Sequence, residues 1–411
     1  MKNIQLFIDG EFRKSSEGKT FDSLNPANGE KVATCELPSS KDIEDAVEAA
    51  HRAFYSPEWR SIDQKKRSEL LLHISNKLRE RRNEIAELEV LDSGSTLRKA
   101  KADVHNAASY FKVMSKMTAK FEFEKMDEAA SREGFSKNFR IYEPMGVCAQ
   151  IIPWNFPLLM ACWKIGPVIA SGCTTVLKSA SETPGTATIL ADIMNDVGLP
   201  KGVVNIITGD AREGQELIQH PKVSKIGFTG STKVGKEILK VASEDVKKTT
   251  LELGGKSPNI ICEDADLDIA VDGSLFAFLY HSGQACDSGT RILVSEKISD
   301  QFIEKLLKRM EEIKIGLPDD INTGFGPVVS EKQRETIMSY IETSKNEGAK
   351  LLYGGRRLTQ GDFGNGQFIE PTVFEITPDH TIFHEEIFGP VAGITKFKTE
   401  DEAIELANRS R

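Results

Sequence analysis

The sequence lacks an excess of positive charge and any long uninterrupted apolar run. Its 53 Lys and Arg residues against 62 Asp and Glu give a net charge of −9, which argues against a nucleic-acid partner, because nucleic-acid-binding proteins present basic surfaces. The longest apolar stretch, residues 146–177, is interrupted by three prolines, Asn155 and Lys164. A membrane span needs about 20 mostly apolar residues. We therefore expect neither nucleic acid nor membrane as a partner.

Cysteine is also scarce, and its spacing excludes two roles. The six cysteines are Cys35, Cys148, Cys162, Cys173, Cys262 and Cys286. They form no C-x-x-C pair and have no histidine at metal-ligand spacing, so we expect neither disulfides nor a metal site. The first ten residues show no secretory pattern. These features predict a protein of a reducing compartment, the cytoplasm.

The 411 residues predict two to three domains of ordinary soluble composition. Amphipathic helices are expected over 41–57, 62–91 and 100–118, the first capped by Ser39 or Ser40. Residues 119–142 are charged and lack helical periodicity, which favours an excursion such as a hairpin.

From residue 147 onward, short apolar strands alternate with helices. Strands are expected at 147–152, 174–177, 203–208 and 224–229, and helices at 158–170, 184–197 and 212–220. This alternation predicts an α/β fold with a parallel sheet, whose ligand sites lie at the carboxyl ends of the strands. A second α/β region follows from about 253, with helices near 267–280, 298–314 and 331–347.

One cysteine has a setting that the others lack. Cys286 ends the run Gly283-Gln284-Ala285-Cys286, so small residues flank a thiol that a substrate could approach. Glu252 stands 34 residues upstream in a similar glycine-rich turn, Glu252-Leu253-Gly254-Gly255. A thiol nucleophile with a separate carboxylate base is typical of covalent catalysis.

Four further motifs could carry chemistry, and each has an ordinary structural alternative. Gly230-Ser231-Thr232 follows an expected strand and could bind a phosphate at a helix N-terminus, or simply cap the helix. Asn155, between Pro153 and Pro157, could stabilise an oxyanion, or cap a loop.

The other two motifs involve charged side chains. Lys178 ends an expected buried strand, where it could reach a ribose or phosphate, although a lone lysine is usually a solvated charge. The pair Glu385-Glu386 precedes Ile387-Phe388-Gly389-Pro390, and its ordinary interpretation is an acidic surface.

The order of these motifs along the chain resembles the aldehyde dehydrogenase superfamily. Trp154-Asn155, Lys178, Gly230-Ser231-Thr232, Glu252-Leu253-Gly254-Gly255, Cys286 and Glu386-Ile387-Phe388-Gly389-Pro390 succeed one another over essentially the whole chain. The resemblance implies a Rossmann-like cofactor-binding domain, residues 1–122 and 143–252, and an α/β catalytic domain, residues 253–411. It also implies a bridging hairpin, residues 123–142, used in a homodimer or homotetramer.

The resemblance assigns roles to particular residues. Cys286 would be the nucleophile, Asn155 the oxyanion donor with the Cys286 backbone N–H, and Glu252 the general base. The implied cofactor-binding residues are Ile151, Pro153, Trp154, Lys178, Ser181, Gly230, Ser231, Gly235, Leu253, Glu386 and Phe388. The implied substrate funnel comprises Phe156, Met160, Trp163 and Asp287.

The implied reaction oxidises an aldehyde to a carboxylic acid with NAD or NADP as the cofactor. The Cys286 thiolate adds to the aldehyde, hydride leaves for the nicotinamide, and water activated by Glu252 hydrolyses the resulting thioester. Relatives that transfer the acyl group to coenzyme A generally lack the hydrolytic glutamate, so Glu252 counts against that alternative.

Three positions depart from the family pattern. NAD-preferring members usually carry a glutamate where Ser181 stands, so we expect NADP to be accepted, because serine does not repel a 2′-phosphate. Trp163 replaces the arginine of succinic semialdehyde dehydrogenases and favours an uncharged, apolar aldehyde. Asp287, beside the nucleophile, is a polar residue for which the sequence suggests no role.

The last departure is at the end of the chain, because family members usually continue well beyond the position of Arg411. We expect a catalytic domain that ends there to be of low stability or inactive, because it would expose apolar surface and unpaired strand edges. The alternative function is therefore an impaired relative that only binds nucleotide.

Overall fold

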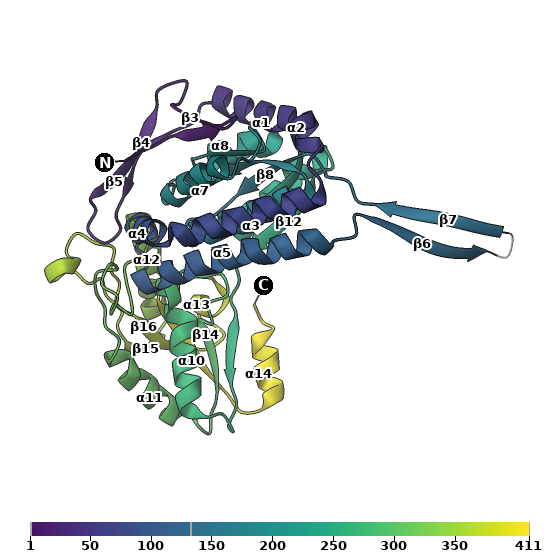
Figure 1. The fold of residues 1–411 in the computed structure, drawn as a ribbon. Coiled ribbons are helices and arrows are strands. Elements are labelled where there is room, and N and C mark those ends of the chain that lie inside the picture. Colours follow the sequence, from purple (N-terminus) through teal and green to yellow (C-terminus); the bar gives the residue numbers. More distant parts are fainter. Residues whose placement is uncertain (1, 132–133, 411) are drawn as a thin grey trace.

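Two α/β bodies lie one above the other, and a long two-stranded ribbon projects sideways from the upper one (Figure 1). The computed structural model describes residues 2–131 and 134–410. The upper body holds most of the first half of the chain, and the lower body holds the second half. The α/β fold with parallel sheets that the sequence predicts is confirmed.

The upper body is built on a seven-stranded sheet in the order β12-β11-β8-β9-β10-β2-β3. The five parallel strands are β8 (Val147–Ile151), β9 (Thr174–Lys178), β10 (Val204–Ile207), β11 (Val223–Gly230) and β12 (Lys248–Leu253). An antiparallel hairpin of β2 (Leu6–Ile8) and β3 (Glu11–Arg13) extends the sheet beyond β10. Neighbouring residues of β9 point to opposite faces, so Val176 and Leu177 belong to two separate apolar cores.

The sequence analysis missed β12. This strand begins with Lys248-Thr249-Thr250, and its residues alternate between exposed and half-buried positions. It is an edge strand, so it lacks the continuous apolar run that marks a strand buried on both faces.

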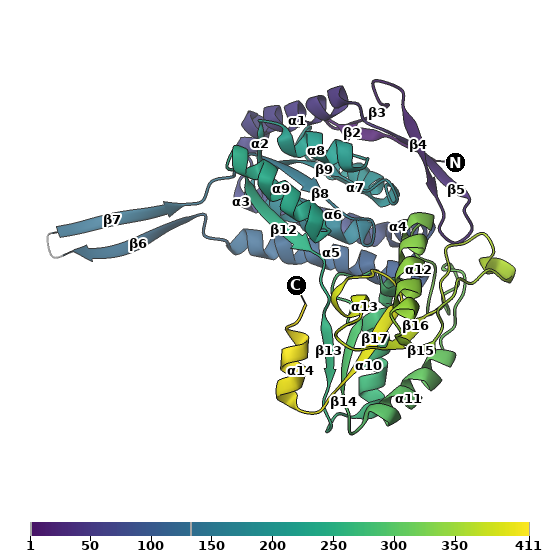
Figure 2. The same cartoon turned by 180° about the vertical axis from the view of Figure 1, so that it is seen from behind.

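Helices cover both faces of this sheet (Figures 1 and 2). Between the strands run α6 (Pro157–Ser171), α7 (Gly185–Asp196), α8 (Ala211–Gln219) and α9 (Thr232–Glu244). The N-terminal helices are α1 (Ser40–Tyr55), α2 (Pro57–Arg60), α3 (Gln64–Glu80), α4 (Arg82–Ser93) and α5 (Leu97–Lys120).

The prediction of a single helix over residues 62–91 is wrong, because two helices, α3 and α4, occupy this region. Arg81 has φ −93° and ψ 15°, which ends α3 and starts α4. The helix expected over 41–57 is also divided, because Ser56 is extended and caps α2, whose first residue is Pro57. Proline favours that first position because its missing N–H would have no partner there.

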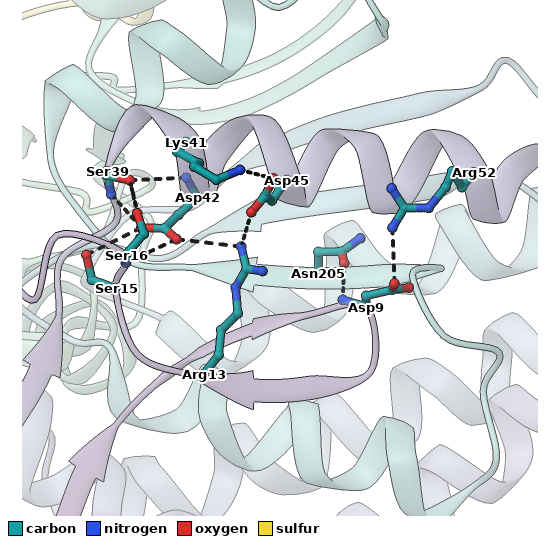
Figure 3. Close-up of polar contacts among 10 residues, drawn as sticks. All are labelled: Asp9, Arg13, Ser15, Ser16, Ser39, Lys41, Asp42, Asp45, Arg52 and Asn205. Carbon is teal, nitrogen blue, oxygen red and sulfur yellow. Dashed lines mark hydrogen bonds and ion pairs between the residues drawn. The ribbon is translucent and has the colours of Figure 1, made fainter.

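The start of α1 is held by a dense polar cluster around Asp42 (Figure 3). Ser39 is the N-cap, which resolves the choice between Ser39 and Ser40. The buried Asp42 carboxylate accepts hydrogen bonds from the Ser39 N–H at 2.9 Å and the Ser16 N–H at 3.0 Å. Arg13 lies 3.6 Å away. The cluster joins α1 to the segment that follows β3. The N-terminal segment also forms a three-stranded sheet in the order β1 (Lys2–Ile4), β5 (Lys31–Glu36) and β4 (Thr20–Leu24).

The lower body has a five-stranded sheet in the order β13-β14-β17-β16-β15. Its strands are β13 (Pro258–Ile261), β14 (Arg291–Ser295), β17 (Val391–Phe397), β16 (Thr372–Glu375) and β15 (Lys350–Tyr353). Its helices are α10 (Leu267–Leu279), α11 (Ser299–Glu311), α12 (Glu331–Asn346), α13 (Thr381–His384) and α14 (Glu400–Ala407), with short 3-10 turns η1 (Tyr280–Gly283) and η2 (Gly361–Phe363). The expected helices of this region are confirmed to within a few residues.

The projecting ribbon is an antiparallel pair, β6 (Glu124–Ser131) and β7 (Gly134–Ile141). Its base is closed by a 2.8 Å hydrogen bond from the Tyr142 N–H to the Phe123 carbonyl. The expected hairpin is therefore present. Among the described residues, no helix combines the length and apolar character that crossing a membrane requires.

Candidate active site

A cavity of about 320 Å³ lies where the loops of the two bodies meet. Its walls come from the carboxyl ends of β8, β11 and β12, the turn before Cys286, one face of α12, and the turn after α13. The lining residues are Pro153, Trp154, Asn155, Phe156, Met160, Thr229, Gly230, Ser231, Glu252, Leu253, Gly254, Cys286, Gln333, Thr336, Tyr340, Glu386, Ile387 and Phe388. Twelve of these were expected at the site from the sequence.

The turn that presents Cys286 is conformationally unusual. His281, Ser282 and Gly283 all have positive φ, at 52°, 57° and 72°. Glycine is required at the third position, because a Cβ on Gly283 would lie 2.1 Å from the carbonyl oxygen of Gly389. Non-glycine residues in this region are strained, and such strain persists only where surrounding contacts enforce it. The Ser282 hydroxyl supplies one of these contacts by donating to the Gly326 carbonyl at 2.9 Å.

Cys286 differs from the other cysteines in its exposure. Its residue is exposed in the cavity, whereas Cys35, Cys148, Cys162 and Cys173 are buried and Cys262 is intermediate. Partial burial raises the pKa of the Cys286 thiol, and the Asp287 carboxylate raises it further. The backbone N–H groups of Cys286 and Asp287 act in the opposite direction, because they stabilise the thiolate.

The Asn155 side chain is buried, and a hydrogen bond to the backbone fixes its orientation. Its side-chain nitrogen donates to the Gln284 carbonyl at 2.8 Å. An amide nitrogen has two N–H groups, so the second remains available to a substrate oxygen near Cys286. Pro157 starts α6 immediately after this turn, which fixes the backbone on the far side of Asn155.

Glu252 is exposed at the carboxyl end of β12 and lines the same cavity as Cys286. The register of β11 and β12 pairs it with Thr229, beside the Gly230-Ser231 turn. Burial lowers the pKa of Lys164 on α6 to about 8, and the Glu252 carboxylate opposes this shift. A carboxylate with one side open to the cavity can accept a proton from a bound water.

Of the two roles considered for the Gly230-Ser231 turn, the structure shows the capping role. Ser231 caps α9, because its hydroxyl accepts the Val234 N–H at 3.4 Å. Gly230 and the cap residue Ser231 line the cavity, so the start of this 13-residue helix lies next to it, and a helix N-terminus favours an anion. A Cβ on Gly230 would lie 2.6 Å from the Phe228 ring, so a larger residue here would displace that ring. Gly235 does not line the cavity; it packs α9 against Leu253.

Glu386 and Phe388 close the opposite wall. The Glu386 carboxylate accepts the Gly255 N–H at 3.3 Å and lies so close to Gly254 that a Cβ there would be 2.0 Å away. Burial raises the pKa of Glu386. Phe388 has a positive φ of 57°, and its ring meets the Trp154 ring edge-on at 5.2 Å between centroids.

The remaining expected residues do not line this cavity. Ile151 and Lys178 are buried, and the Lys178 ammonium donates to the Gly209 carbonyl. Ser181 lines a separate cavity of about 400 Å³, where the carboxylates of Asp210 and Glu182 both lie within hydrogen-bond distance of its single O–H. Trp163 is 46% exposed. Asp287 is exposed beside Cys286 but does not face the cavity.

The sequence analysis missed the polar face of α12. Gln333, Thr336 and Tyr340 line the cavity, and the Gln333 amide donates to the Phe388 carbonyl at 2.8 Å. Their i, i+3, i+7 spacing places them on one side of a helix. That stripe was visible in the sequence, but only the fold shows that it faces the site.

Comparison with known proteins decides the family. The sequence profile of the aldehyde dehydrogenase family matches residues 12–411. The chain belongs to the aldehyde dehydrogenase family. It is 42% identical to an aldehyde dehydrogenase of Aspergillus niger over 98% of this chain and 80% of that protein. It is also 42% identical to a betaine aldehyde dehydrogenase of Bacillus subtilis, over 98% and 82% of the two chains.

Solved structures of this family have the same fold. An NAD+ complex of an aldehyde dehydrogenase from Bacillus cereus superposes with a TM-score of 0.95 at 39% identity, covering 100% of this chain and 82% of the other. A betaine aldehyde dehydrogenase from Staphylococcus aureus in complex with NAD+ also gives 0.95, at 40% identity and covering 99% and 80%.

Proposed function

We propose that this aldehyde dehydrogenase oxidises its substrate to the free carboxylic acid through a covalent bond to Cys286. The observation that carries the proposal is that Cys286, Asn155 and Glu252 line one cavity, although they come from three distant parts of the chain. The Cys286 thiolate adds to the aldehyde carbon, and the carbonyl oxygen becomes an oxyanion that Asn155 and the Cys286 N–H stabilise. Glu252 later removes a proton from the water that attacks the thioester, and Cys286 leaves as the thiolate.

NAD+ is the proposed cofactor, and its chemistry is to accept the hydride released from the substrate carbon. The chain offers a fitting cleft. Gly230 and Ser231 leave the N-terminus of α9 accessible to a pyrophosphate, and Glu386, held by the Gly255 N–H, is positioned to bind a ribose hydroxyl. Lys178 and Ser181 remain candidates for the adenosine ribose, at the carboxyl end of β9.

Two carboxylates near Ser181 argue against the expectation that NADP is readily accepted. Ser181 does not itself repel a 2′-phosphate, but the carboxylates of Asp210 and Glu182 both lie within hydrogen-bond distance of its hydroxyl. Negative charges this close disfavour a phosphate. We therefore propose NAD+ as the preferred cofactor, with NADP+ as a poorer one. The ratio of kcat/KM for the two cofactors tests this, and a preference for NADP+ would contradict it. Asp210→Asn should move the ratio toward NADP+.

The aldehyde is proposed to be apolar, since Phe156 and Met160 line the cavity. A cationic aldehyde is the second candidate. The aromatic side chains of Trp154, Phe156 and Phe388 line the cavity together with the Glu386 carboxylate. Aromatic faces near negative charge favour a quaternary ammonium group, which matches the betaine aldehyde dehydrogenases among the relatives. Comparing hexanal with betaine aldehyde separates the two.

Three variants test the mechanism by NADH formation and product analysis. Cys286→Ser should abolish turnover. Asn155→Ala should lower kcat about 10²–10³-fold, the usual cost of one lost oxyanion donor. Glu252→Gln should give a rapid burst of at most one NADH per Cys286 and then slow turnover, because thioester hydrolysis is impaired. Full steady-state activity of Cys286→Ser would refute the proposal, and acyl-CoA as the product would refute the hydrolytic step.

A further inference from the structure

Gln284 joins the two halves of the proposed site through a chain of buried hydrogen bonds. The residue has no exposed surface. Its backbone carbonyl accepts the Asn155 side-chain N–H at 2.8 Å. Its side-chain nitrogen donates to the His281 carbonyl at 3.0 Å, and its side-chain oxygen accepts the Val329 N–H at 2.9 Å. One residue thus contacts the oxyanion donor, the strained turn and the segment that leads into α12.

The two side-chain bonds act on the strained part of the turn. His281, Ser282 and Gly283 are held in the left-handed region, which costs free energy unless surrounding contacts enforce it. The Gln284 amide bridges the start of this turn and the Val329 N–H, so it resists relaxation of the turn. The carbonyl that orients Asn155 belongs to the same residue, and Cys286 follows two residues later.

We propose that Gln284 is a positioning residue that sets the Asn155 amide and the Cys286 backbone N–H in register, so that both donors meet one oxyanion. Gln284 touches neither substrate nor cofactor, because it does not line the cavity. The inference rests on the proposed function, since the oxyanion is part of that mechanism. If the turn relaxes, the N–H groups of Cys286 and Asp287 also lose their alignment with the sulfur, and the thiolate becomes less stable.

The test uses Gln284→Met, which keeps the shape of the side chain but removes both amide bonds. Asn205→Leu is the matched control. Asn205 is equally buried, and its amide makes three hydrogen bonds, to Asp9, Thr175 and Gly202, on β10 away from the cavity. Gln284→Glu is the second variant if Gln284→Met does not fold, because it keeps the shape and the acceptor for the Val329 N–H and, when ionised, replaces the donor to the His281 carbonyl by a negatively charged oxygen.

The first readout is a double-mutant cycle on kcat. Gln284→Met should lower kcat by about 10²-fold, the effect of misplacing a catalytic group by roughly 1 Å, with the Kd for NAD+ unchanged. Because Gln284 acts through Asn155, Asn155→Ala should cost much less in the Gln284→Met background than in the wild type. Asn205→Leu should combine with Asn155→Ala multiplicatively. If Gln284→Met also combines multiplicatively, the proposal is overturned.

The second readout needs no turnover and so separates this inference from the proposed function. The pH dependence of Cys286 alkylation by iodoacetamide, followed by peptide mass spectrometry, reports the thiol pKa. Gln284→Met should move the profile to higher pH, and Asn205→Leu should leave it in place. An inactive wild-type chain with this shift would refute the proposed function alone. An unmoved profile would refute the role of Gln284.

Discussion

Among charged residues, Asp287 has the largest effect on the pKa of the thiol of Cys286, the proposed nucleophile. Burial raises the pKa of the Cys286 thiol first, and the neighbouring Asp287 carboxylate adds to that effect. The thiolate is the reactive form, so at neutral pH this charge lowers the fraction of reactive cysteine. The sequence suggested no role for Asp287, but its position next to Cys286 raises the pKa of the thiol and so lowers the thiolate fraction.

We predict that Asp287→Asn increases the rate of Cys286 alkylation at pH 7 by about three- to tenfold, because removal of a nearby negative charge lowers the thiol pKa. The measurement is iodoacetamide labelling at the Cys286 peptide. Asp287→Glu keeps the charge and serves as the control. Equal rates for the two variants would show that charge is not the cause.

At the scale of single elements, the N-terminus of α1 depends on one carboxylate. Burial alone would raise the pKa of Asp42, but hydrogen bonds from the backbone and hydroxyl groups of Ser39 and Ser16 outweigh burial and lower it. A carboxyl group with a lowered pKa stabilises the fold above its unfolded pKa. That contribution is lost as pH falls through the lowered value.

We predict that Asp42→Asn lowers the free energy of unfolding by about 1–2 kcal/mol at neutral pH, the usual cost of losing hydrogen bonds that cap a helix N-terminus. The difference in unfolding free energy between variant and wild type should be smaller below pH ~3.9, the ordinary pKa of aspartate. Denaturant unfolding at both pH values measures it. Asp45→Asn is the control on the same helix (Figure 3), because Asp45 pairs with Arg13 and Lys41 in a more exposed position. A larger loss for Asp45→Asn would contradict the assignment.

The sequence pattern predicted those helices and strands whose position is set by neighbouring residues. The strands β8 and β9 are continuous apolar runs and were predictable, whereas the sequence left the cap of α1 open between Ser39 and Ser40, and the structure decided for Ser39. The break at Arg81 was not, because no proline or glycine marks it. The edge strand β12 was missed because its pairing with β11, rather than its own composition, makes it a strand.

At the scale of the whole molecule, the ribbon of β6 and β7 extends away from both bodies (Figures 1 and 2). A lone two-stranded ribbon is marginally stable in water, and its outer edges offer unpaired backbone groups to another chain. We propose that it mediates the expected homo-oligomer.

We predict that replacing residues 124–141 with a short Gly-Ser linker leaves the two bodies folded but reduces the molecular mass in solution, by light scattering, to that of a monomer. The Tyr142–Phe123 hydrogen bond already brings the ends of the excised segment together. An unchanged oligomer would place the interface elsewhere.

A second prediction for the whole molecule concerns stability and pH. Neither carboxylate oxygen of Glu89 has a hydrogen-bond partner among the described residues, and burial raises its pKa well above the ordinary value. Burial likewise raises the pKa of Asp92 to about 7. The folded state therefore holds these protons more tightly than the unfolded state, so the free energy of unfolding falls as pH rises from about 5 to 8.

We predict that Glu89→Gln stabilises the protein at pH 8, because glutamine cannot ionise and so avoids the cost of a buried carboxylate charge, and that it flattens the dependence of stability on pH. Thermal unfolding at several pH values checks this. Glu87→Gln, on the exposed side of α4, should change neither. A Glu89→Gln variant less stable than the wild type at pH 8 would contradict the prediction.

The sequence by itself determined which side chains are available for the proposed chemistry: a cysteine among small residues, a glutamate in a glycine-rich turn and an asparagine between prolines, in one order along the chain. Those choices are local, because a turn or a strand end is fixed by a few neighbouring residues. Only the tertiary structure decided which groups share a cavity. It placed Gln333 on the cavity wall and Gln284 behind it, left Trp163 and Asp287 outside, and set two carboxylates beside Ser181. Most of these relations arise from packing between segments that are distant along the chain, such as Asn155 and Gln284, which are 129 residues apart, and no local pattern encodes them.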